Sequence, residues 1–219
     1  MEAERQSASA GHAGHGSIWS VLTNKQVWLL AVIYAGSSAT SNTLSLWMPQ
    51  ILKGFGLSNL ETGLLNMIPF GIASAFMIFW GMRADKSGER IWSTALPLAL
   101  TSLSFALTLF TGSLTVTLVL LSLVLLGNYA IKGPFFALAT ETLSPAAAAA
   151  GIAAINTIAH VGTGAITSLI GMLREQTGSF PVALLPLCVL TAIGCLLVFW
   201  IGRDQMRAAQ SAAAATPAE

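Results

Sequence analysis

Charged residues along the chain are separated by long stretches that contain none. Asp, Glu, Lys and Arg are absent from residues 26–52, 62–82, 91–131, 142–173 and 176–202. A helix needs about 20 apolar residues to cross the hydrocarbon core of a bilayer, so each stretch can hold at least one span. The longest stretch, 91–131, divides at Thr111-Gly112-Ser113 and supplies two.

Six spans follow from this pattern, with expected bounds of 27–50, 61–82, 91–110, 114–139, 146–172 and 181–202. We expect helices because an open sheet would leave backbone groups unpaired in lipid. A soluble helical core would instead need a polar face on each helix. The predicted fold class is therefore an all-α integral membrane protein, with six transmembrane helices in one bundle.

The composition agrees with this class. Of the 219 residues, 54% are hydrophobic and 9% are charged, whereas about a quarter of residues are charged in soluble domains. The mean hydropathy is +0.73. These values exclude an ordinary soluble enzyme and a disordered chain. The net charge of +1 gives no basic surface for nucleic acid.

The chain divides into a polar tail over 1–24, the six-span bundle over 25–207 and a disordered tail over 208–219. An even number of spans puts both termini on one side of the membrane. That side would carry most of the basic residues, namely Arg5, Lys25, Arg83, Lys86, Arg90, Arg203 and Arg207, against Lys53 and Arg174 opposite. Because basic residues favour the cytoplasmic side, we expect a multi-pass protein of the inner (plasma) membrane with both termini cytoplasmic.

Several spans carry polar residues on one face. In the first span these are Tyr34, Ser37, Ser38, Ser41, Asn42 and Ser45, and in the fifth they are Asn156, His160, Thr163 and Thr167, both sets at helical spacing. The second span adds Asn66 and Ser74, and the fourth adds Asn128 and Lys132. Two interpretations stay open: the stripes could line a water-filled cavity, or small polar residues could let the helices pack closely.

Lys132 is the most informative of these residues. Placing an ammonium near the bilayer centre costs about 2.5–3.5 kcal/mol on insertion scales. In a cavity it would attract a carboxylate strongly, because screening there is weak. Alternatively, its side chain could reach the headgroups or pair with Glu141. Pro134, which removes a helix hydrogen bond, predicts a bend nearby.

No group of residues points to catalysis, so we expect no enzyme activity, cofactor or metal site. His160 could carry a proton or could be a structural histidine. It lies 19 residues from Glu141, and we place Glu141 at a membrane edge, so the two are not expected to meet in an intramembrane active site. Cys188 and Cys195 lie in one span and are interpreted as small apolar residues.

The loop between the second and third spans reads GMRADKSGER, from Gly81 to Arg90. Its two glycines allow a tight turn and a close approach of helices. Asp85 can accept hydrogen bonds from backbone amides at a helix start, or from Arg83 and Arg90. Such a cluster could latch two helices together and release them when they rock.

This string resembles the G-x-x-x-D-[RK]-x-G-x-[RK] signature of the major facilitator superfamily. Three further stretches, LTNKQVWLLAVIY (22–34), LWMPQILKGFGLSNLETGLLNMIPF (46–70) and KGPFFALATETLSPAAAAAGIAAINTIAHVG (132–162), are similar to the C-terminal half of the anion:cation symporters. That family includes tartrate, phthalate and hexarate permeases. The resemblance covers residues 18–207.

The resemblance implies a secondary transporter in which two six-helix bundles hold a small organic anion between them and rock to move it with protons. The matching gating-loop residues are Gly81, Arg83, Asp85, Lys86, Gly88 and Arg90. Lys132 would contact the anion, and hydrogen bonds would come from Asn128, Asn156 and His160, with Tyr34 and Asn42 on the facing helix. The family commonly has Trp at the position of Phe136 and Asn at that of His160.

We expect only one of the two bundles in this chain, because Met1 stands where the family's central linker would lie. Three possibilities remain: a fragment of a broken or mis-started gene, a partner for a separately encoded first half, or a homodimer in which a second copy supplies the missing wall. The alternative function is a six-span membrane scaffold or partner subunit without transport of its own.

Overall fold

The computed structural model describes residues 22–144 and 148–215, and every regular element in this part of the chain is helical. The helices are α3 (Lys25–Lys53), α4 (Asn59–Ser87), α5 (Ile91–Leu107) with the short η1 (Thr108–Phe110), α6 (Leu114–Ala130), α7 (Lys132–Thr142), α8 (Ala148–Thr177), α9 (Phe180–Ala183) and α10 (Leu185–Ala215). Of the two predicted tails, residues 1–21 and 216–219 lie outside the described residues. Helix α10 runs to Ala215, into the segment 208–219 for which no regular structure was expected.

The prediction of six helices is confirmed. Helices α5 and η1 together form one rod, α6 and α7 a second, and α9 and α10 a third, so that the short elements do not add spans. The expected division at Thr111–Ser113 is present, because helix ends at Phe110 and resumes at Leu114. The helix of the fourth span is interrupted at Ile131, three residues before Pro134. Because Pro134 has no backbone N–H, it cannot donate a hydrogen bond to the carbonyl oxygen of Ala130.

Five of the six rods are long and apolar enough to cross a membrane by length and composition, and α3 is not among them. Helix α3 has 29 residues, but its Ser, Thr and Asn residues lower its hydropathy. Its position in the bundle compensates, because α3 packs against both α8 and α10 and buries Ser37, Ser38 and Thr40 among protein. Polar groups in a span are tolerated where protein surrounds them.

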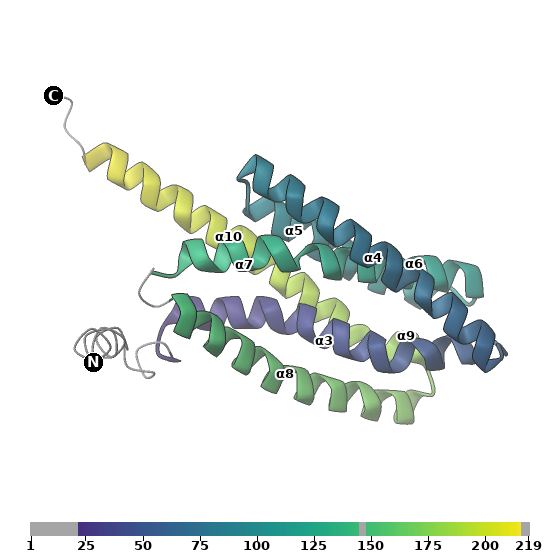
Figure 1. Cartoon of the computed structure of the whole chain (residues 1–219). Helices are drawn as coiled ribbons and strands as arrows, with labels where there is room; N and C mark the ends of the chain where they lie inside the picture. Colours follow the sequence, from purple (N-terminus) through teal and green to yellow (C-terminus); the bar gives the residue numbers. More distant parts are fainter. Residues whose placement is uncertain (1–21, 145–147, 216–219) are drawn as a thin grey trace, which may run out of the picture.

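The bundle has two sides joined by α10. Figure 1 shows α3 and α8 side by side, with α4, α5 and α6 grouped opposite, and α10 contacts both α3 and α5. The beginning of α3 and the end of α10 lie at the same end of the bundle (Figure 1), where the Lys25 ammonium sits 4.9 Å from the centre of the Trp200 ring. Many apolar side chains of α4, such as Leu64 and Met67, stay exposed.

Helices α5 and α6 approach each other closely at Gly127. A Cβ atom added there would lie 2.5 Å from both the Pro97 carbonyl oxygen and Thr101 Oγ1. The Thr101 hydroxyl uses this proximity, since it lies within hydrogen-bond distance of the Pro97 oxygen (2.9 Å) and of the Val124 oxygen across the interface (3.3 Å). Small residues that admit such contacts are a principal means of packing helices in lipid.

We predict that Gly127→Ala destabilises the bundle by about 1–3 kcal/mol, because the backbone of Pro97 cannot move aside for the methyl group. The measurement is the thermal unfolding midpoint of the purified protein in detergent. Gly71→Ala in α4 is the matched control, since no atom lies within 4 Å of its added Cβ, and its midpoint should be unchanged or slightly higher. Equal midpoints for the two variants would contradict the prediction.

Candidate functional site

Two groups of polar residues stand out in the bundle. We call the first the polar face; it spans α3, α6, α7 and α8 and consists of Tyr34, Ser41, Asn42, Asn128, Lys132, Asn156 and His160. We call the second the charged cluster; it consists of Asp85, Arg90 and Glu141 at the end where α4, α5 and α7 meet. The polar face contains the residues expected to bind an anion, and the charged cluster belongs to the expected gate.

Asn128 connects α6 to α3. Its side-chain amide donates to Ser41 Oγ at 2.8 Å, and the Ser37 hydroxyl donates to the Asn128 backbone oxygen at 3.4 Å. Asn128 is only 1% exposed, so these bonds lie inside the bundle. For Ser37 and the amide of Asn128, these bonds favour the packing interpretation of the stripes. Asn128 Oδ1 remains buried without a hydrogen-bond partner among the described residues.

Lys132 is the first residue of α7, and its ammonium lies 4.3 Å from the centre of the Tyr129 ring. Tyr129 in turn contacts Phe70 of α4 edge-on, with ring centres 6.3 Å apart. Within the described part of the chain Lys132 has no carboxylate partner, and the alternative in which it pairs with Glu141 is wrong, because Glu141 pairs with Arg90. A ring face holds the ammonium more weakly than a carboxylate would.

Aromatic side chains join α3, α7 and α8 about one helical turn after Lys132 along the chain. The Tyr34 ring stacks on Phe135, with centres 5.2 Å apart and planes at 15°, and also contacts Phe136 at 5.1 Å. The His160 ring lies farther away, 6.5 Å from Tyr34 between ring centres. Phe135 is buried, Tyr34 and Phe136 are half-buried, and His160 is exposed. The structure thus brings together two predicted site residues, Tyr34 and His160.

The two remaining asparagines bond to their own helices. The amide of Asn42 donates to the Ser38 oxygen and that of Asn156 to the Ile152 oxygen, each at 3.0 Å. Asn42 is exposed and Asn156 half-buried. Each keeps its side-chain oxygen free to accept from another donor, since no hydrogen bond to that oxygen occurs among the described residues.

Arg90 holds the charged cluster together. Its Nε donates to Glu141 Oε1 at 2.9 Å, and its Nη1 donates to Asp85 Oδ1 at 3.0 Å. The expected contact between Asp85 and Arg90 is therefore present, and Glu141 at the end of α7 is an additional partner. The hydrogen bond to Glu141, and then that to Asp85, raises the pKa of Arg90 above its ordinary value. The guanidinium stays charged and ties the loop after α4 to α7.

The other gating-loop residues have more local roles. Gly88 ends α4 with φ of 64°, a left-handed conformation that favours glycine. Gly81 lies against Gly133: a Cβ atom built on Gly133 would be only 3.8 Å from the Cα atom of Gly81. The Arg83 guanidinium lies over the Trp80 ring at 5.3 Å, and Lys86 is exposed in the last turn of α4. Arg83 therefore takes no part in holding Asp85.

Sequence reasoning missed the roles of Glu141, Phe135 and Glu89. Glu141 was expected at a membrane edge, and its partner Arg90 lies 51 residues away, so no local signal pointed to the pair. Glu89 accepts from the backbone amides of Trp92 and Ser93 at the start of α5. An acidic residue just before a helix was the available signal for that contact.

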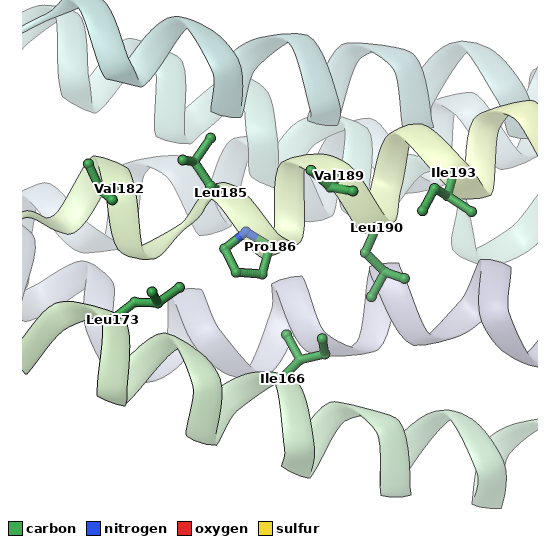
Figure 2. Close-up of a pocket in the computed structure, with 8 residues that line it drawn as sticks. All are labelled: Ile166, Leu173, Val182, Leu185, Pro186, Val189, Leu190 and Ile193. Carbon is green, nitrogen blue, oxygen red and sulfur yellow. The ribbon is translucent and has the colours of Figure 1, made fainter. Parts of the chain in front are cut away.

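Figure 2 shows an apolar pocket between α8 and the α9–α10 rod, with a volume of about 440 Å³. Ile166 and Leu173 line it from α8, and Pro186 and Val189 from α10. No residue of the polar face or of the charged cluster lines this pocket. Its lining offers no donor for an anion, so it does not compete with the polar face as the candidate site.

A family model described as Major Facilitator Superfamily matches residues 2–167. The chain belongs to this superfamily. It is therefore a multi-pass membrane protein of a transporter family and not an enzyme.

Relatives support the same assignment. A protein of Agrobacterium vitis named "Putative tartrate transporter" is 40% identical over 207 residues, which cover 93% of this chain and 46% of the relative. A second A. vitis protein of the same name is 36% identical over 211 residues, with 96% and 46% coverage. The Escherichia coli "Inner membrane transport protein RhmT" is 30% identical over 184 residues, with 81% and 42% coverage. The chain spans about half the length of the relatives it matches.

We predict that Arg90→Gln loosens the end of the bundle, because Asp85 and Glu141 lose their shared cation. Hydrogen–deuterium exchange measured by mass spectrometry should become several-fold faster in peptides covering 84–90 and 138–142. Arg83→Gln is the control, since Arg83 contacts the Trp80 ring and no carboxylate among the described residues, and it should leave exchange at 138–142 unchanged. Unaltered exchange in Arg90→Gln would show that the cluster does not hold α7.

Proposed function

We propose that the chain is the C-terminal six-helix half of a secondary transporter of the anion:cation symporter type, which moves small carboxylates with protons by alternating access. The supporting observation is Lys132, an ammonium within a membrane span that contacts an aromatic ring and, among the residues the structure describes, no carboxylate. By contrast, Lys53, Arg90 and Arg174 lie at or near the ends of the six rods. The two relatives named for tartrate support a carboxylate as the transported molecule.

A bound carboxylate would take the place of the Tyr129 ring on Lys132. The contact with the ring contributes about 0.5–2 kcal/mol, and a charge pair in a poorly screened site is worth more. Tyr34 and His160 can donate hydrogen bonds from α3 and α8. In this proposal the side-chain amides of Asn42 and Asn156 orient the anion, and these pre-placed donors reduce the cost of removing its water. Asn128, which is buried and bonded to Ser41, supports the site by holding α6 against α3.

The charged cluster serves as the gate in this proposal. Arg90 joins the loop after α4 to the end of α7, one end of the α6–α7 rod that carries Lys132. Movement of that rod would have to separate Arg90 from Glu141, which makes the cluster a latch with two discrete states. Gly81 and Gly133 mark the place where α4 and α7 would slide past each other.

A complete cavity requires a second bundle. The proposal assigns this role to a first half of the kind that the longer relatives contain, or to a second copy of this chain. The exposed apolar side chains of α4 and α8, among them Met67, Ile72 and Val161, are available to lipid or to such a partner.

We predict that Lys132→Met lowers kcat/KM for tartrate uptake at least tenfold, because the anion loses its cation. For this measurement, the chain is fused to the half of the A. vitis relative that the chain does not match, and uptake is measured in vesicles that contain equal amounts of inserted protein. Lys132→Arg should retain part of the activity, and Lys53→Met, at the exposed end of α3, is the control. Unchanged kinetics for Lys132→Met would remove this residue from the site.

The proposed orientation, with both termini in the cytoplasm, has its own test. Cysteine is introduced at Ser87 or at Glu175, two exposed positions at opposite ends of the bundle, in a chain lacking Cys188 and Cys195. A membrane-impermeant maleimide added to intact cells should label Glu175→Cys and not Ser87→Cys. The reverse pattern would place the termini outside, and labelling of both positions in intact cells would contradict the six-span topology.

A further inference from the structure

The apolar pocket between α8 and the α9–α10 rod opens toward the surroundings of the bundle. Figure 2 shows Ile166 and Leu173 of α8 on one side of it, with Pro186 and Leu190 of α10 on the other. Val189 also lines the pocket and is exposed, so the pocket is not closed off inside the core. Both rods are long and apolar enough to span a membrane, and the medium at the opening is therefore lipid.

The pocket exists because α8 and α10 pack mainly against other helices. Helix α8 packs against α3 and α9, whereas α10 packs against α5 and α3. The α9–α10 rod is interrupted at Leu184, two residues before Pro186, which has no backbone N–H for the carbonyl oxygen of Val182. An empty gap between the two helices would lose dispersion contacts on both sides, so an apolar filler is favoured.

The length of the pocket matches the depth of one lipid leaflet. Along the α9–α10 rod its lining extends from Val182 to Ile193, which is about 16 Å at 1.5 Å per residue. This length is about half of the 30 Å thickness of a bilayer's hydrocarbon core. The pocket starts near the connection between α8 and α9 and continues inward along the rods, in the direction that an acyl chain of that leaflet would take.

A cation stands at the end of the pocket that is nearest this connection. Arg174 follows the lining residue Leu173, and its guanidinium lies 4.0 Å from the centre of the Phe180 ring. The Phe180 ring packs edge-on against Trp47 of α3, with ring centres 5.8 Å apart, and Trp is typical of the level of the lipid headgroups. Arg174 contacts no carboxylate in the described part of the chain, so its guanidinium is available to a phosphate, whose geometry it matches.

We infer that the apolar pocket binds one acyl chain of a membrane phospholipid and that Arg174 holds the phosphate of the same lipid. Apolar contact alone would not select a particular lipid, because the hydrocarbon around the bundle is equally apolar. The selection comes from the charge-assisted hydrogen bonds between the guanidinium and the phosphate. No residue of the polar face lines the pocket, so the inference goes beyond the proposed function and does not depend on the transported molecule.

The test uses photocrosslinking of the full chain in lipid nanodiscs. The probe is a phosphatidylglycerol that carries a diazirine in one acyl chain, and mass spectrometry locates the labelled residues after irradiation. Labelling within 164–173 and 182–193 should be at least fivefold stronger than within 64–79 of α4, whose exposed apolar side chains report lipid that contacts the bundle without selection. A diacylglycerol with the same diazirine chain but no phosphate should show no such preference.

Equal labelling of the pocket and of α4 by the phosphatidylglycerol probe would overturn the inference. Labelling of the pocket below that of α4 would also overturn it and would indicate that another protein surface, such as a second copy of this chain, covers the pocket. An equal preference of the diacylglycerol probe for the pocket would remove the phosphate contact.

Variants identify the two parts of the site. Arg174→Gln should lower labelling of the pocket by phosphatidylglycerol at least threefold, whereas Arg174→Lys, which keeps the charge, should retain part of it. Lys53→Gln is the matched control, because Lys53 ends α3 at the same end of the bundle. Unchanged labelling in Arg174→Gln, or an equal loss in Lys53→Gln, would overturn the assignment of the phosphate to Arg174.

Val189→Trp tests the apolar part of the site. The larger side chain at this exposed position should fill the pocket and lower labelling within 164–173 at least threefold, while labelling of α4 stays the same. The thermal unfolding midpoint of the variant, measured in the same nanodiscs, shows whether the bundle is intact. Unchanged labelling within 164–173 would show that the acyl chain does not lie between α8 and α10.

Discussion

The high cost of leaving a polar group unpaired in hydrocarbon governs the arrangement of this bundle. The effect is visible in α3, the rod with the most hydroxyl and amide side chains in its centre, although its buried Thr40 and Thr43 hydroxyls have no hydrogen-bond partner among the described residues. Helix α3 packs against α8 and α10, and its Ser37 and Ser41 bond to Asn128 of α6. The more uniformly apolar α4 can instead leave much of its surface exposed. In these two helices, polar content therefore agrees with burial in the bundle.

Close backbone contacts make these hydrogen bonds possible. At Gly127 the absence of a side chain lets α6 approach Pro97 and Thr101 of α5. Asn128, the next residue, is then directed to the other side of α6, where it meets α3. One short stretch of α6 therefore joins two neighbouring helices, and the polar face is built on a segment whose position is held from both sides.

The two cations of greatest interest have opposite environments. Arg90 is satisfied by two carboxylates, which contribute modestly where solvent can screen them but fix the geometry of the loop. Lys132 lies within a span, and its ammonium contacts the face of Tyr129 and no carboxylate in the described part of the chain. A paired cation suits a latch and an unpaired one suits a binding site, because only the second still gains substantially from a new anion.

Much of the fold could be read from the sequence, because hydropathy and charge act locally. The uncharged stretches located all six rods. Thr111-Gly112-Ser113 marked the break between two of them, and Pro134 marked the interruption in the fourth. The loop from Gly81 to Arg90 already contained both members of the Asp85–Arg90 pair. The candidate site was only partly readable. Helical spacing placed Tyr34 and Asn42 on one face, and His160 on another, without saying which faces meet.

Tertiary structure decided which helix faces contact one another. Asn128 and Ser41 lie 87 residues apart, and Arg90 and Glu141 lie 51 apart, so their contacts depend on which helices are neighbours and how each is rotated about its axis. In a chain this apolar, hydropathy alone barely distinguishes one rotation from another. The choice came from glycine contacts and from the few buried polar groups that had to find partners, and these are properties of the packed bundle.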